Sequence, residues 1–188
     1  SLVPIVFTDA RKEVGITELL DLITTYTPSP ADASPPKLVD GDKVTEVKAD
    51  PNAPLSGLVF RVAYDPRSNM KYSNIRIYSG TLKTDTSLVR NDERKGLRPG
   101  HILKAQGTET VEVPVGVAGD IVLLAKVDEL RAGDMIPDGK MAGKFQVPKP
   151  PAPMFSLAME PVSRGDEQKI GGALKKLSEE DPCFQTTR

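Results

Sequence analysis

Basic side chains gather in one stretch of this 188-residue chain, and their chemistry is that of phosphate binding. Residues 61–98 carry nine Lys or Arg and four Asp or Glu, a local net charge of +5, whereas the whole chain has a net charge of -1. Tyr64, Tyr72 and Tyr78 are interleaved with these cations. Cations that follow a phosphate backbone give salt-dependent affinity for nucleic acid. The alternative is a solvated rim of charge without a ligand, and composition alone leaves both interpretations open.

The sequence carries none of the familiar catalytic or nucleotide-binding motifs. It has no Gly-x-x-x-x-Gly-Lys-Ser/Thr phosphate loop, no Gly-x-Gly-x-x-Gly after a strand, no Gly-x-Ser-x-Gly and no His-Glu-x-x-His. A single Cys183 excludes an internal disulfide and a Cys-based zinc site, and a single His101 excludes a zinc site that needs two histidines. We therefore predict no catalytic residue, no metal site and no cofactor for this chain.

We expect the protein to be located in the cytoplasm. No run approaches the roughly 18 apolar residues of a membrane span, so we expect no membrane partner. Residues 1–10 have no basic segment before an apolar stretch, so no signal peptide opens the chain. The absence of an initiator Met suggests an excised piece.

Prolines mark the boundaries of the elements that must position the basic groups. Six of the 17 prolines lie in residues 28–54 and four lie in residues 148–153. Because Pro lacks a backbone donor and restricts the residue before it, such clusters interrupt regular structure. We expect stiff, extended linkers over residues 31–54 and 142–153.

The first segment, residues 1–30, predicts a strand followed by a helix. The strand covers Leu2 to Phe7, and the helix ends before Pro28. One apolar stripe follows the i, i+3, i+4, i+7 spacing: Ile16, Leu19, Leu20 and Ile23. Fewer than about 40 residues rarely bury a core alone, so we predict the last βα unit of a larger domain.

The middle segment, residues 55–141, predicts strands throughout. Apolar residues alternate with their neighbours in two runs, which are Leu58, Phe60, Val62 and Val111, Val113, Val115, Val117. Short strands separated by turn residues indicate a small closed β-barrel. The predicted fold class is therefore mainly β.

The last segment, residues 154–188, predicts half of a split βαβ domain. A strand covers Phe155 to Met159, and a second strand begins at Cys183-Phe184. The helix between them carries one apolar stripe: Ile170, Ala173, Leu174 and Leu177. We expect this segment to be truncated.

This order of segments resembles bacterial translation elongation factor G over nearly the whole chain. Pro28-Ser29-Pro30 follows the first helix as it does in that family. The stretches that resemble its second domain are Asp65-Pro66, Ile75-Arg76-Ile77-Tyr78-Ser79-Gly80-Thr81-Leu82, Ala118-Gly119-Asp120-Ile121 and Ala132-Gly133-Asp134. Those that resemble its third domain are Glu160 to Ile170, Ala173 to Leu177 and Glu180-Asp181-Pro182.

The resemblance implies a translational GTPase that drives movement of transfer RNA and messenger RNA on the ribosome. Residues 1–30 would end its GTP-binding domain, residues 55–141 would be its second domain, and residues 154–188 would begin its third. GTP and magnesium would be cofactors of the full-length protein, and the phosphate loop and switches would lie outside this chain. We expect no enzyme activity here and a monomer that binds the ribosome and not DNA.

The resemblance also implies that the barrel lies against small-subunit ribosomal RNA. Cations in loops reach phosphate more easily than strand residues, whose direction is fixed by the pleat, so Arg61 and Arg76 rank lower. The predicted contacts are Arg67, Lys71, Arg94, Lys95 and Arg98.

Two further stretches are assigned by the resemblance. Asp9, Ala10 and Arg11 correspond to a guanine-contact loop, in which Asp9 stands where the family usually has Ser, so we expect a divergent paralogue. The third-domain motif is Arg164, Gly165, Asp166 and Glu167, which is either a structural helix cap or a functional contact. The alternatives for the whole chain are a protein-interaction barrel or part of a related release or ribosome-protection factor.

Overall fold

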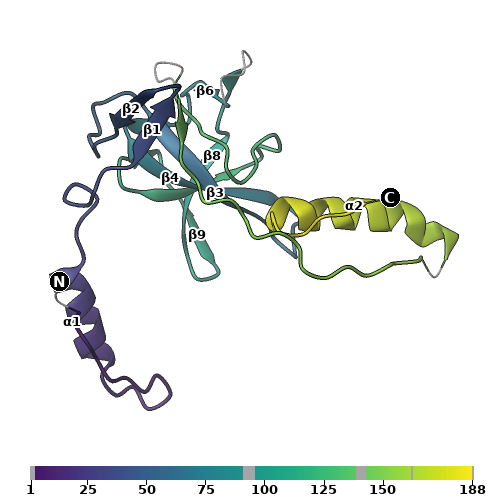
Figure 1. Ribbon diagram of the computed structural model, residues 1–188, viewed down its shortest axis with the longest axis horizontal. Coiled ribbons are helices and arrows are strands. Elements are labelled where there is room, and N and C mark those ends of the chain that lie inside the picture. Colours follow the sequence, from purple (N-terminus) through teal and green to yellow (C-terminus); the bar gives the residue numbers. More distant parts are fainter. Residues whose placement is uncertain (1–2, 91–95, 139–142, 162, 188) are drawn as a thin grey trace. The chain divides into compact units, whose positions relative to one another are not determined.

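The computed structural model describes residues 3–90, 96–138, 143–161 and 163–187 (Figure 1). The chain divides into two compact units, Ser1–Ser34 and Pro35–Arg188. The first unit contains α1 (Ile16–Tyr26). The elements of the second unit are β1 (Lys37–Asp40), β2 (Lys43–Glu46), β3 (Ser56–Tyr64), β4 (Lys71–Ser79), β5 (Thr81–Lys83), β6 (Leu88–Val89), β7 (Gly96–Leu97), β8 (His101–Gln106), β9 (Glu109–Glu112), β10 (Val115–Val117), β11 (Ile121–Ala125), β12 (Lys144–Phe145) and α2 (Arg164–Glu180).

In the first unit the predicted helix is confirmed and the predicted strand is wrong. Residues 3–8 form no strand, and Phe7 is 88% exposed. A strand needs a partner for its backbone groups, and the described part of this unit offers none. The helix α1 likewise buries no residue, so its apolar stripe lacks a covering surface within the unit.

The second unit is mainly β, as predicted. Its largest sheet is antiparallel and runs β3-β4-β11-β8-β9. The pairs β5–β10 and β6–β7 are separate ladders, so the described strands do not make one continuous closed ladder. They nevertheless share one core, and we call β3 to β11 with this core the barrel. Its fully buried side chains include Val59, Val62, Ile75, Ile77, Leu82, Leu88, Ile102, Val122, Leu124, Leu130 and Ile136.

The strand β3 departs from the predicted alternation because it contains a β-bulge. The register with β4 shifts between Val59 and Arg61. An extra residue in one strand reverses which side chains face inward beyond it. Val59 and Val62 are therefore both buried, whereas Phe60 is 48% exposed.

The predicted run of alternating valines is two strands. Pro114 separates β9 from β10, because proline cannot donate to a ladder. In β10 the valines face outward and Gly116 faces the core. A Cβ at Gly116 would lie 2.7 Å from Cδ1 of Ile77, so this position admits only glycine without movement of its neighbours.

Both predicted linkers contain strands, which corrects the expectation of two extended connections. Residues 37–46 form the β1–β2 hairpin and residues 144–145 pair with β1, in the sheet order β12-β1-β2. Leu38 and Phe145 are buried there with Val47, Leu58 and Met135 in a second hydrophobic cluster. Apolar side chains between the prolines thus fold these stretches onto the outside of β3.

The last segment confirms the predicted helix and corrects both predicted strands. Residues 154–161 form no strand, and Phe155 and Leu157 are at least 80% exposed. Cys183 and Phe184 lie in a turn, closed by the Phe184 N–H donating to the Asp181 carbonyl at 3.0 Å. No opposing strand for either stretch lies within the described residues, so their backbones stay irregular.

Candidate nucleic-acid interface

The loop between β3 and β4 holds one predicted cation in a preorganised turn. The Asp65 carboxylate accepts hydrogen bonds from the Arg67 N–H at 3.1 Å, the Ser68 N–H at 3.2 Å and the Ser68 hydroxyl. These bonds, led by that of the Ser68 hydroxyl, lower the pKa of Asp65 below its usual value. Arg67 is exposed in this loop. The turn therefore presents a guanidinium from a fixed backbone, which suits phosphate binding.

The structure presents a second predicted cation, and two others lie outside the described residues. Arg98 follows β7 and is exposed between buried Leu97 and buried Pro99. Arg94 and Lys95 belong to the stretch 91–95, which is not among the described residues.

Lys71 is not available for RNA in this conformation, which corrects its prediction as a surface contact. Its side chain is only 2% exposed. The ammonium donates to the Asp128 carbonyl at 2.7 Å and to Oε2 of Glu179 at 2.9 Å. The residue opens the inward-facing row of β4, which continues with Ser73 and Ile75. Period-two alternation through this strand was the sequence signal that points Lys71 inward.

Two arginines that the sequence ranked lower share the outer face of the sheet. Arg61 lies opposite Asn74 in the β3–β4 ladder, and Arg76 is two residues further along β4. Arg61 is exposed and Arg76 is half-buried. Residues diagonal across a ladder are within about 7–8 Å at Cα, so the two guanidinium groups belong to one surface.

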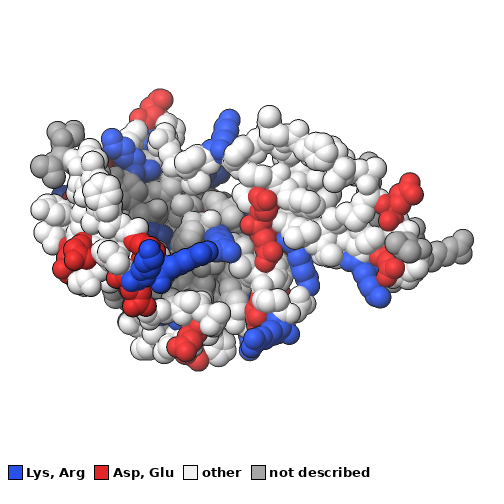
Figure 2. All heavy atoms as spheres, turned by 90° about the horizontal axis from the view of Figure 1, so that it is seen from below, with Lys and Arg blue, Asp and Glu red and all other residues white. Residues whose placement is uncertain are grey.

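The charged side chains in Figure 2 do not form an uninterrupted basic surface. Among the residues drawn in colour on that face, cations stand singly or beside acidic groups. Lys104 is paired with an acid, since its Nζ lies 3.0 Å from Oδ1 of Asp120. Burial opposes ionisation of Asp120, but bonds from the Val117 N–H and Lys104 outweigh it and lower its pKa.

The helix α2 contacts the barrel through charged and polar groups, which sequence reasoning missed. Figure 1 shows α2 beside the end of β3. Oε2 of Glu179 accepts from the Tyr64 hydroxyl at 2.6 Å as well as from Lys71, and Oε1 of Glu180 accepts from the Tyr64 N–H. The Lys176 ammonium donates to Oδ1 of Asn69 at 2.6 Å and lies 5.3 Å from the centre of the Tyr64 ring.

Both ends of this contact have shifted pKa values. Burial raises the pKa of Glu179, but the bonds from Tyr64 and Lys71 outweigh this and the net shift is downward. Burial and the neighbouring Glu179 carboxylate raise the pKa of Tyr64 well above its ordinary value. The junction therefore consists of an ionised carboxylate, an ammonium and a neutral phenol.

Two family models match this chain. The model of elongation factor G domain 2 matches residues 54–139, which hold the barrel, and the model of elongation factor G domain III matches residues 150–188, which hold α2. The chain belongs to the elongation factor G family. The matched domains are those of a translation elongation factor.

A solved structure supports the family fold. The crystal structure of a protein from Thermus thermophilus is similar at 29% sequence identity, with a TM-score of 0.74. The match covers 95% of this chain and 24% of that chain. The present chain thus spans about a quarter of the length of that protein.

The loop that resembles the guanine-contact loop of elongation factor G is closed on itself. Oδ1 of Asp9 accepts from the N–H groups of Arg11 and Lys12 at 3.1 and 3.2 Å. Asp9 and Val14 exchange backbone bonds across the loop. Oδ1 of this carboxylate is therefore engaged by the loop's own turn. The roles of Asp9, Ala10 and Arg11 stay predictions.

The third-domain motif of this elongation factor G chain begins α2 with a local hydrogen bond. The Ser163 hydroxyl donates to Oδ2 of Asp166 at 2.7 Å, and the Asp166 N–H donates to the Ser163 carbonyl at 3.0 Å. Gly165 follows Arg164 in the first turn. The Ser163 side chain caps no backbone N–H of this helix, so the structural-cap interpretation stays a prediction. A contact of Arg164 or Glu167 with a partner stays a prediction.

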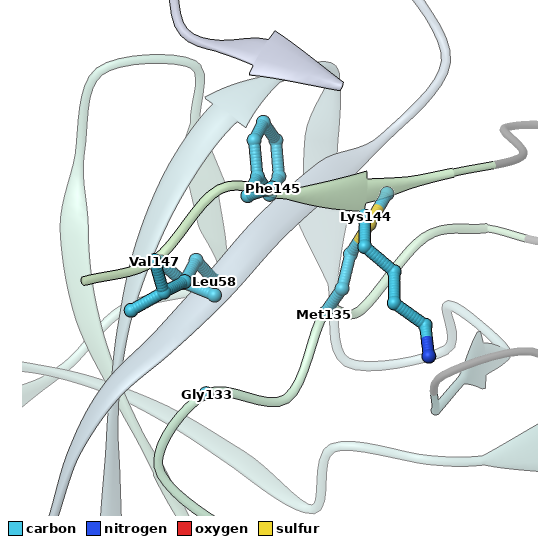
Figure 3. A pocket seen from close by; sticks show the side chains of 6 residues that line it. All are labelled: Leu58, Gly133, Met135, Lys144, Phe145 and Val147. Carbon is cyan, nitrogen blue, oxygen red and sulfur yellow. The ribbon is translucent and has the colours of Figure 1, made fainter. Parts of the chain in front are cut away.

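A shallow cavity of about 240 Å³ lies beside β3 and β12 (Figure 3). In Figure 3 the Lys144 ammonium points away from the Phe145 ring. The lining residues are Leu58, Gly133, Met135, Lys144, Phe145 and Val147. Most of these residues belong to or flank the second hydrophobic cluster, so the cavity is a gap at its edge.

The described part of the chain contains no group of three or more His, Cys, Asp or Glu side chains that could hold a metal ion. None of its helices is long and apolar enough to cross a membrane.

Proposed function

We propose that this chain is the middle of a ribosomal translocation GTPase, in which the barrel anchors the factor on small-subunit ribosomal RNA. The proposal rests on the family membership together with one observation, the exposed Arg67 in a turn fixed by Asp65. A cation whose backbone is already ordered loses little entropy when it binds a phosphate.

Arg98 and Arg61 extend the proposed contact. Both side chains are exposed. Each cation that neutralises a phosphate adds to an affinity that falls with salt, without reading sequence. The proposed role of the barrel is therefore positioning, which couples the nucleotide domain to the later domains.

The remaining features of the proposed full-length protein follow from the family. They are GTP and magnesium bound by a separate nucleotide domain, a cytoplasmic location and a monomeric state. The chain itself supplies none of the hydrolytic groups in this proposal.

Co-sedimentation with purified ribosomal subunits across a salt series tests the anchoring role. Native chain is expected to bind the small subunit preferentially, and Arg67→Glu with Arg98→Glu is expected to remove that binding. The matched control is Lys37→Glu with Lys43→Glu, two exposed cations of the β1–β2 hairpin. This control should bind as the native chain does.

The other outcomes have distinct meanings. Binding that survives the arginine reversals, or that both reversals weaken equally, would refute the assigned contacts. Absence of binding to either subunit would favour a protein-interaction barrel, whose partner does not carry phosphate.

A further inference from the structure

The barrel end that receives α2 has the donors of an anion-binding site. The Tyr64 hydroxyl, the Tyr64 N–H and the Lys71 ammonium all donate to carboxylate oxygens of Glu179 or Glu180. A hydroxyl, a backbone amide and an ammonium that converge on oxygen atoms are the groups that also bind phosphate. At present both anions come from the chain itself.

We propose that Glu179 and Glu180 cover a latent phosphate-binding site on the barrel, and that an RNA phosphate takes their place when α2 leaves. This inference rests on the proposed function, because the ligand is the RNA that the barrel contacts. Lys71 would then act beside Arg67, which lies four residues earlier at the same hairpin.

The helix is held in a way that permits release. Its apolar stripe is only partly covered, since Leu177 is 47% exposed, Ala173 is exposed, and Ile170 and Leu174 are half-buried. The described contacts with the barrel are instead hydrogen bonds, one ion pair and a cation–π contact. Polar interfaces between domains are typical of parts that move relative to each other.

Release of α2 does not leave a buried charge without a partner. Lys71 is buried partly by the helix that neutralises it, so water reaches the ammonium when the helix departs. The Asp128 carbonyl, which belongs to the barrel, remains as a second acceptor at 2.7 Å. Exchange of a carboxylate for water or phosphate therefore leaves Lys71 solvated or paired in every state.

The test uses the whole chain with Glu179→Ala and Glu180→Ala, because alanine preserves the helix while removing both carboxylates. The matched control, Asp42→Ala with Glu46→Ala, removes the same charge from exposed positions on the β1–β2 hairpin. Binding of a short single-stranded RNA is measured across a salt series. A third variant adds Lys71→Gln to the first.

We expect the helix variant to bind RNA more tightly than the control, with a salt slope steeper by about one phosphate contact. Adding Lys71→Gln should abolish that gain. Hydrogen exchange of the last turn of α2 should become at least about tenfold faster in the helix variant, while exchange at Ile75 and Val122 in the core stays slow. The proposal is overturned if the RNA affinity of the helix variant rises no more than that of the control. It is also overturned if the rise in affinity persists when Lys71→Gln is added.

A measurement on the unchanged chain guards against a variant that fails to fold. Excess RNA should speed exchange in the last turn of α2, because phosphate competes with Glu179 for Lys71. Unchanged or slower exchange in saturating RNA overturns the proposal. Failure of the native chain to prefer the small subunit refutes the proposed function instead, since these readouts do not use ribosomes.

Discussion

The ammonium of Lys71 lies 2.9 Å from Oε2 of Glu179, although 108 residues separate them in the chain. One residue begins a barrel strand and the other lies in the last turn of the third-domain helix. This ion pair converts a cation of the proposed RNA surface into an internal contact between two domains of the family. It makes the placement of α2 sensitive to charge.

Acid should loosen α2 from the barrel. The folded-state pKa of Glu179 lies below its ordinary 4.5, so the unfolded or released state binds more protons. The stabilisation is therefore complete above about pH 5 and is lost as the pH falls through the folded-state pKa. Hydrogen exchange in the last turn of α2, measured from neutral pH to pH 3 and corrected for intrinsic rates, should show this loss.

The groups that face Glu179 define the control for this pH dependence. Tyr64, Lys71 and Lys175 act on Glu179 itself, and Asp128 and Glu180 act on its partner Tyr64. Glu179→Gln should remove most of the pH dependence of exchange in the last turn of α2. Lys175→Gln, a change at an exposed neighbour, should retain most of that pH dependence. An unaltered profile in Glu179→Gln would contradict the assignment.

Replacement of Gly116 by Ala should destabilise the barrel by about 1–3 kcal/mol. The added Cβ would lie 2.7 Å from Cδ1 of Ile77 and 3.0 Å from Cγ1 of Val122, so both core side chains must shift. Urea unfolding measures the change. The control is Gly100→Ala, where a Cβ meets no atom within 4 Å, and a similar loss in both variants would argue against the overpacking explanation.

Phe145→Ala should lower the free energy of unfolding by about 3 kcal/mol if residues 144–145 are a structural strand rather than a linker. The Phe145 ring is 9% exposed, and its centre lies 4.7 Å from that of Tyr78. Val147→Ala, at a position 46% exposed, is the matched control and should change stability little. Equal midpoints of thermal unfolding for the two variants would restore the linker interpretation.

Arg67→Ala should lower the salt slope of small-subunit binding by about one unit. Lys71→Gln should leave this slope unchanged while α2 is docked, because its side chain is 2% exposed. The measurement is the observed affinity at several salt concentrations for both variants. A slope reduced by Lys71→Gln alone would mean that ribosomal RNA reaches Lys71 in the native chain, so that α2 does not stay docked during binding.

Periodicity in the sequence was sufficient to predict both helices and most of the barrel, because these elements follow local patterns. The bulge at Phe60 escaped prediction, since an extra residue in a strand depends on its partner. The β1–β2 hairpin escaped because prolines around it outweighed Leu38, whose burial requires Phe145 from a distant part of the chain. Lys71 was assigned as a loop cation, but it begins β4, and one of its two acceptors is supplied by α2.

The remaining site residues illustrate the same limit. Exposure of Arg67 follows from a turn whose Asp65-Pro66 signal is local, so sequence reasoning placed it well. Strands at residues 2–7 and 155–159 were expected from composition, but a strand exists only with a neighbour to pair with. The local sequence pattern sets the preference for a strand, and tertiary contacts decide whether the strand forms.

The lone thiol of Cys183 lies three residues beyond Glu180, in the turn that follows α2. Burial and the nearby Asp181 raise the pKa of this thiol, so alkylation will be slow at neutral pH and faster in mild alkali. Since the chain contains no other cysteine, a maleimide dye attaches to this position alone. The native sequence thus supplies a single fluorescent reporter at the end of the helix, with no engineered attachment point.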